Sequence, residues 1–157
     1  MEAAINIAAY IADRYKNETG VSIDEMKLHK LLYFSQRECV IQTGSPLFSE
    51  QFYAWKYGPV LVKVRDIIRK RGIVSLPSGY ELPEKYLSVM NKVFSQYAHK
   101  TSWSLSRLSH GEISWQKARN GFSPDESCGV ALSLEDIKAD AQRIRLRRSV
   151  ISILEKR

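Results

Sequence analysis

The sequence predicts a mostly α protein, a compact single domain of about six to seven helices with one or two short β segments. Apolar residues recur at helical spacing in most segments of the chain. Ser22 and Ser133 each precede an acidic residue by three positions, a pattern typical of helix starts. With 157 residues, 44% of them hydrophobic and 26% charged, the chain is long enough to bury one core. We therefore expect residues 1–157 to form a single domain.

The expected helices follow one another with short breaks. The first covers about residues 3–16 and the second about 22–43, where Gly44 is well placed to end it. Further helices are expected at about residues 59–71, 83–98, 103–109 and 133–157, with a piece of one or two turns after Ser114. The segment 73–83 has the residues of a loop or small hairpin, and GVAL at 129–132 those of a short strand.

The stretch FYAWKYGPV, residues 52–60, concentrates aromatic residues around a Gly-Pro step. Gly58 can adopt backbone angles closed to other residues, and Pro59 suits the first position of the helix that follows. One interpretation is an aromatic corner that closes one end of the core. The other is a recognition surface, because Trp55, Lys56 and Tyr57 on a rigid backbone would make good anchors.

The second predicted helix has two stripes of different character. One is apolar, contains Leu28, Leu31 and Leu32, and is expected in the core. The other is mixed and contains Met26, Lys30, Tyr33 and Arg37. This mixed stripe predicts either a solvated face or a binding face.

The net charge of +7 favours an acidic partner, such as nucleic acid or an acidic protein surface. Residues 138–157 hold seven basic and two acidic residues, so most of the excess lies in the C-terminal helix. The apolar positions of that helix change sides after Arg145, which predicts a kink or packing against something else. The basic helix at about 133–157 is therefore a candidate contact with a partner.

No catalytic, cofactor-binding or metal site is predicted, and we expect the protein not to be an enzyme. His110 and Glu112 are close in sequence but lack the third member of a triad, and no GxSxG motif activates a serine. Cys39 and Cys128 are far apart and are expected to be reduced thiols. No apolar run is long enough to span a membrane, so a cytoplasmic protein is expected.

Four stretches, in the same order, resemble the Panacea domain antitoxin family, the SocA-like or GepA-like phage-associated proteins. They are KLHKLLYFSQ, PLFSEQFYAWKYGPV, LSHGEISWQKAR and ALSLEDI, within residues 26–137. The resemblance implies a mostly helical domain that binds and neutralises a protein toxin encoded beside it. It also implies that SocA-like members act as adaptors, presenting the toxin to an ATP-dependent protease. The residues that match the motifs are Trp55, Tyr57, Gly58, Pro59, His110 and Trp115.

These observations together predict an antitoxin that binds a cognate toxin encoded by a neighbouring gene, as a 1:1 complex, a homodimer or a 2:2 complex. The alternatives are an adaptor for an ATP-dependent protease and a DNA-binding regulator, the latter with weak nucleic-acid binding. The predicted toxin-binding residues are Lys30, Tyr33, Arg37, Trp55, Lys56 and Tyr57. Gly58, Pro59, His110 and Trp115 are predicted to be structural.

Overall fold

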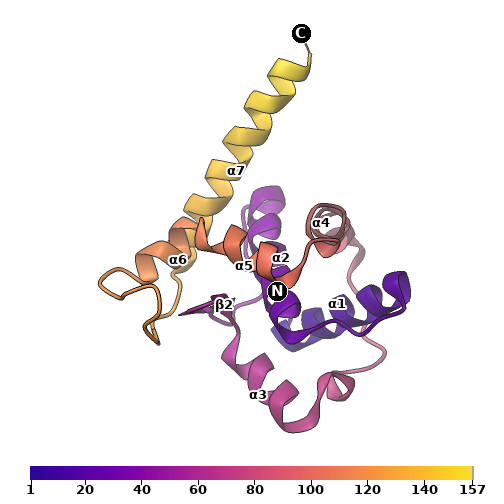
Figure 1. Ribbon diagram of the computed structural model, residues 1–157. Helices are drawn as coiled ribbons and strands as arrows, with labels where there is room; N and C mark the ends of the chain where they lie inside the picture. Colours follow the sequence, from indigo (N-terminus) through magenta and orange to yellow (C-terminus); the bar gives the residue numbers. More distant parts are fainter. Residues whose placement is uncertain (157) are drawn as a thin grey trace.

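The computed structural model describes residues 1–156, and seven α-helices dominate that part of the chain (Figure 1). The helices are α1 (Ala4–Thr19), α2 (Glu25–Thr43), α3 (Val62–Arg71), α4 (Leu87–Val93), α5 (Ser102–His110), α6 (Ile113–Ala118) and α7 (Leu134–Glu155). Strands β1 (Tyr53–Trp55) and β2 (Gly58–Val60) form one antiparallel hairpin. Short helical turns lie at Ile73–Ser75, Glu84–Tyr86 and Phe94–Ala98. The predicted mostly α fold is confirmed.

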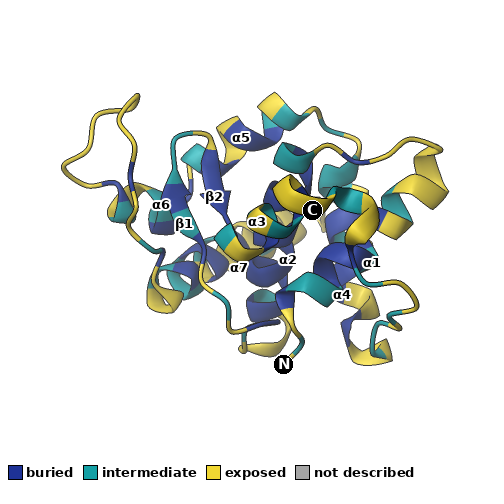
Figure 2. Cartoon of the chain, turned by 90° about the horizontal axis from the view of Figure 1, so that it is seen from below, coloured by how far each residue is buried: buried dark blue, intermediate teal, exposed yellow. Residues whose placement is uncertain are grey.

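Helix α2 runs through the centre of the molecule and contacts α1, α4, α5, α7 and β2 (Figure 2). Every residue from Lys27 to Val40 is buried, so the helix is enclosed on all sides. The mixed stripe is enclosed with the rest, because Lys30, Tyr33 and Arg37 are 1%, 0% and 2% exposed. The expectation that this stripe is a surface face is therefore wrong. Its polar groups are satisfied by neighbouring helices and by the hairpin, not by water.

The helix ends largely follow the local signals in the sequence. Gly44 adopts a left-handed conformation and ends α2, and the Ser133 side chain caps α7 by accepting a hydrogen bond from Asp136 N at 3.1 Å. The N-terminus of α2 is capped by Asp24 and not by Ser22, since Asp24 Oδ1 accepts from Lys27 N at 2.8 Å. The N-terminus of α5 is capped by Thr101, whose side chain accepts from Ser104 N at 3.1 Å.

Pro59 lies in the middle of β2, so the prediction that it starts a helix is wrong. It pairs with Ala54 in the hairpin, and α3 begins only at Val62. In a two-stranded ribbon the outer edge has no partner, and a proline without an N–H is tolerated there. On the other side of the hairpin, Ala54 N donates to Val130 O and Leu132 N donates to Phe52 O. The predicted GVAL strand is therefore present as an isolated bridge at Ala131.

Helix α7 starts in the core and then extends away from the body of the protein (Figure 1). Its first half buries Ile137, Ala141 and Ile144. Its second half exposes Leu146, Val150, Ile151, Ile153 and Leu154. The helix runs from Leu134 to Glu155 without a break, and packing of its second half against a partner stays a prediction. None of the described helices is both long enough and apolar enough to span a membrane.

Candidate protein-binding site

The tip of the hairpin has its backbone fixed by side chains from three surrounding regions. Five carbonyl oxygens between Ala54 and Pro59 each accept a hydrogen bond from a different side chain. The bonds are Arg119 Nη1 to Ala54 O (2.8 Å), Trp115 Nε1 to Trp55 O (2.9 Å), His110 Nε2 to Lys56 O (3.0 Å), Ser106 Oγ to Tyr57 O (2.7 Å) and Lys30 Nζ to Pro59 O (3.0 Å). Because so many donors converge on one turn, the backbone conformation of the tip is strongly determined.

Gly58 fits this turn because no side chain has room there. Its φ of +112° is disfavoured for other residues. An added β-carbon would overlap Ser109 Oγ and lie 2.6 Å from Lys30 Cε. The missing side chain of Gly58 therefore lets α2, α5 and the hairpin meet at one point.

His110 and Trp115 contact the hairpin from inside. Their rings stack with centroids 4.3 Å apart while each donates to the hairpin backbone. The bond to Lys56 O requires the proton on His110 Nε2. Partial burial lowers the pKa of His110 below its ordinary value, which favours the neutral ring.

The side chains of the tip face outward. Tyr57 is 45% exposed and meets the 59% exposed Trp103 of α5 edge to face, with ring centroids 5.4 Å apart. Lys56 Nζ lies 5.2 Å from the Tyr57 ring centroid, and the Arg65 guanidinium lies 4.8 Å from that of the half-buried Trp55. Trp103 was not among the predicted contacts. Its position in the first turn of α5, where it continues no apolar stripe, is the signal that could have identified it.

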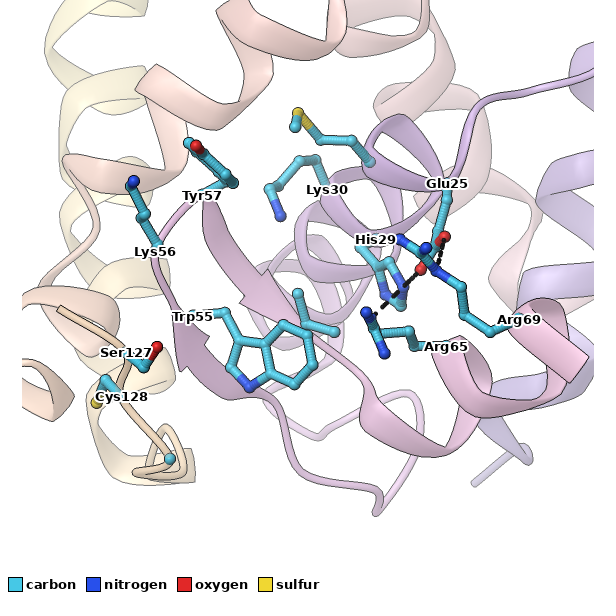
Figure 3. Close-up of a pocket in the computed structure, with 13 residues that line it drawn as sticks. Glu25, His29, Lys30, Trp55, Lys56, Tyr57, Arg65, Arg69, Ser127 and Cys128 are labelled. Atoms are coloured by element: carbon cyan, nitrogen blue, oxygen red, sulfur yellow. Dashed lines mark ion pairs between the residues drawn. The ribbon is translucent and has the colours of Figure 1, made fainter. Parts of the chain in front are cut away.

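Beside the tip lies a cavity of about 580 Å³, which we call the Lys30 pocket (Figure 3). Its wall is formed by the tip, the start of α2, Arg65 and Arg69 of α3, and residues 127–129. Lys30 lines the pocket with its amine bonded to Pro59 O, and burial lowers its pKa from 10.5 to about 7. A second cavity of about 760 Å³ lies next to it, and Trp55 and Gly129 line both.

His29 also lines the Lys30 pocket and is almost fully buried. Its Nδ1 accepts a hydrogen bond from Leu61 N at 3.3 Å, so the proton of the neutral ring is on Nε2. Nε2 has no hydrogen-bond partner, since Glu25 Oε1 is 3.7 Å away. Burial lowers the pKa of His29 below its ordinary value.

Tyr33 and Arg37 lie away from the tip, in a buried polar cluster that joins α2 to α6 and α7. Tyr33 Oη donates to Asp140 Oδ2 at 2.8 Å, and Arg37 pairs with Glu112. The Asp140 carboxylate also accepts from the N–H groups of Ile113 and Ser114, and so caps α6. Burial raises the pKa of Glu112 to about 7. The structure therefore brings four of the six predicted contact residues together, Lys30 and the three tip residues, and places the other two inside the protein.

The described residues contain no group of three or more histidine, cysteine, aspartate or glutamate side chains arranged to hold a metal ion. Cys39 and Cys128 are both free and buried. What the described surface offers is thus a fixed hairpin tip with exposed aromatic side chains and an adjoining pocket. The protein is thus mostly α-helical and presents a hairpin whose backbone is held by five side-chain hydrogen bonds.

Comparison with known proteins identifies the family. The model of the antitoxin SocA-like, Panacea domain family matches residues 28–116, and the chain belongs to this family. The antitoxin SocA of Caulobacter vibrioides (strain NA1000 / CB15N) is 26% identical over 153 residues, covering 85% of this chain and 78% of that protein. No solved structure matches the chain. The matched region contains Lys30, the hairpin, His110 and Trp115, whereas Arg119 and α7 lie beyond it.

Proposed function

We propose that the protein is an antitoxin that neutralises a cognate protein toxin by direct binding, with the hairpin tip in the interface. Membership of the antitoxin SocA-like family supports the antitoxin role. The observation that carries the proposed site is a cluster of side chains at the tip, where the exposed Tyr57 and Trp103 lie beside the partly exposed Trp55 and Lys56. The hairpin backbone that holds Trp55, Lys56 and Tyr57 is fixed by five side-chain hydrogen bonds. Aromatic side chains dominate the energetics of many protein interfaces.

The fixed backbone favours binding for a thermodynamic reason. A loop that becomes ordered on association loses conformational entropy, and each mobile side chain that is immobilised costs roughly 0.5–1.5 kcal/mol. At this tip the backbone is already held, and Tyr57 already rests against Trp103. A partner would therefore order little of the tip when it binds.

We propose the exposed half of α7 as a second contact surface. Five large apolar side chains, from Leu146 to Leu154, lie on a helix that extends beyond the body of the protein. Arg148 anchors the helix at its exit by pairing with both carboxylate oxygens of the buried Glu38, at 3.0 and 2.9 Å. An apolar surface of this kind is typical of an interaction site. The occupant would be the toxin or, in a 2:2 complex, a second copy of the chain.

The arginines of α7 offer little support for the DNA-binding alternative. Arg148 is held by Glu38, and Arg143 donates to Gly111 O at 3.0 Å. Of the four arginines between 143 and 148, only Arg145 and Arg147 are exposed, and Arg143 and Arg148 are partly buried. A phosphate-binding stripe would need more exposed cations on one face.

The test is co-expression with the toxic product of a neighbouring gene, followed by isolation of the complex. We expect growth to be rescued and the two proteins to elute together. Tyr57→Ala and Trp103→Ala, both at exposed positions, are expected to weaken binding at least tenfold each, which is about 1.4 kcal/mol. Val74→Ala, at a 92% exposed position outside the tip, is the matched control.

The outcomes separate the alternatives. Folded tip variants that bind as tightly as the parent would refute the proposed site. Rescue with a falling toxin level that depends on an ATP-dependent protease would favour the adaptor mechanism over neutralisation by binding. No complex and no rescue would refute the antitoxin function with this partner.

A further inference from the structure

The Lys30 pocket contains a buried cation that the protein itself does not neutralise. Lys30 is 1% exposed, and its one hydrogen bond in the described chain goes to the neutral Pro59 O. An ammonium group has three N–H donors, so two remain for another acceptor. The pKa of Lys30 is lowered by burial alone, with no carboxylate close enough to oppose the effect.

The acid nearest to the pocket is already engaged elsewhere. Glu25 Oε2 lies 2.9 Å from Arg69 Nε, and Glu25 Oε1 lies 3.8 Å from Arg65 Nε (Figure 3). One carboxylate thus faces two guanidinium groups at the rim, which leaves the rim positive. His29 adds to the same pocket a buried Nε2 that lies 3.7 Å from Glu25 Oε1 and makes no hydrogen bond. An unpaired buried cation and an unpaired buried donor in one cavity are unfavourable unless a ligand supplies the acceptor.

We propose that the Lys30 pocket receives a carboxylate of the protein partner, an aspartate or glutamate side chain, which pairs with Lys30 Nζ. The identity of the partner rests on the proposed function, whereas the chemistry of the pocket does not. A single negative charge matches the single unpaired amine at the base. Trp55, Lys56 and Tyr57 of the tip line the cavity of about 580 Å³, so a partner on the tip can place a side chain in it.

The proposal assigns a chemical character to the partner surface. At the centre of the contact an acidic side chain would project into the pocket, and the apolar surface around it would rest on the tip aromatics. The net charge of +7 would attract an acidic partner from a distance. The buried amine then provides specificity, because a partner with a neutral side chain at this point would leave Lys30 unpaired.

The test measures the Lys30 amine directly in the free protein. The probes are N-acetyl-glutamate N-methylamide and its neutral isostere N-acetyl-glutamine N-methylamide, each titrated while the Lys30 side chain is followed by NMR. We expect a saturable shift with the glutamate probe, at least fivefold weaker binding of the glutamine probe, and a Lys30 pKa at least one pH unit higher at saturation. Lys30→Met should abolish the discrimination between the probes, whereas Lys16→Met, at an exposed position on α1, should retain it.

Three results would overturn the proposal. The first is equal binding of the two probes, and the second is no saturable shift of the Lys30 NMR signal up to 100 mM glutamate probe. The third is binding of inorganic phosphate at Lys30 without binding of the glutamate probe, which would indicate a site for a free anion. Circular dichroism of each variant establishes that it is folded. The titration uses no toxin, so its result does not depend on the proposed function. If the glutamate probe binds but no toxin complex forms in the co-expression test, only the proposed function is refuted. If a toxin complex forms but the glutamate probe does not bind at Lys30, this inference is refuted and the proposed function is not.

Discussion

Lys30→Met should make the protein more stable at neutral pH. Lys30 is buried in the folded chain, where its pKa is about 7, and is solvated in the unfolded chain, where its ordinary value is 10.5. Burial therefore penalises the charged form, and the penalty destabilises the folded state. Methionine has a similar length, fills similar space and carries no charge.

The magnitude follows from the two pKa values. Below pH 7 both states hold the proton and the penalty is complete. As the pH rises from about 7 towards 10.5, the folded chain is neutral at Lys30 while the unfolded chain is still charged, so stability increases by roughly 1.3 kcal/mol per pH unit. At pH 7 this amounts to about 4 kcal/mol, from which the lost bond to Pro59 O subtracts about 1 kcal/mol. We therefore expect the variant to gain about 2–4 kcal/mol at pH 7.

The assay is urea unfolding followed by circular dichroism at pH 7, 8 and 9, for the parent, Lys30→Met and the control Lys16→Met. Glu112, with its pKa of about 7, and Cys39, whose thiol pKa is raised by burial, also change stability with pH. Both are present in every protein, so their effects cancel in the comparison. The parent and the control should show the same slope between pH 8 and 9, about 1.3 kcal/mol per pH unit steeper than Lys30→Met. Identical slopes, or a less stable Lys30→Met at pH 7, would refute the reasoning.

Three further changes test other parts of the structure. Gly58→Ala should lower the free energy of unfolding in urea by about 2–5 kcal/mol, because it combines a positive φ with a steric overlap. The control Gly20→Ala, at a positive φ with open space around it, should lower it by roughly 1 kcal/mol. Equal losses in the two variants would contradict the tight contact at Gly58. Tyr33→Phe should cost about 1–3 kcal/mol, since a buried carboxylate loses a donor, and Tyr57→Phe should stay within about 0.5 kcal/mol. A chain lacking residues 149–157 should melt within a few degrees of the parent yet bind its partner at least tenfold more weakly; a large loss of stability would mean that this part of α7 supports the core.

Helix positions could be predicted from the sequence because their causes are local. A helix shows its buried side as a 3.6-residue period, and caps such as Ser133 and Gly44 act within a few residues. Local signals failed where one residue suits two kinds of structure. Pro59 suits both the first position of a helix and an unpaired strand edge. In the folded protein it lies in the strand, where it pairs with Ala54 and its carbonyl accepts a hydrogen bond from Lys30.

The functional surface was harder to predict than the fold, because exposure depends on partners distant in sequence. A helix with polar residues on one side normally turns that side to water, which is why the stripe with Tyr33 and Arg37 was expected at the surface. Here Glu112 and Asp140, more than seventy residues away in the chain, supply the matching groups and allow the stripe to be buried. No residue close to the stripe in the sequence indicates that Glu112 and Asp140 will be its partners.

The sequence by itself determined the helical class, the family and the importance of the FYAWKYGPV stretch. Aromatic residues around a Gly-Pro step, at a fixed order relative to the LSHGEISW motif, are local facts of the chain. Only the tertiary structure decided what each residue of that stretch does. It turns the backbone of residues 54–59 inward to five donors and the side chains of Trp55, Lys56 and Tyr57 outward, and it encloses Lys30 beside them. The physical reason is that the hydrogen-bond donors, which lie in α2, α5, α6 and at Arg119 just after α6, converge there only after those helices have packed.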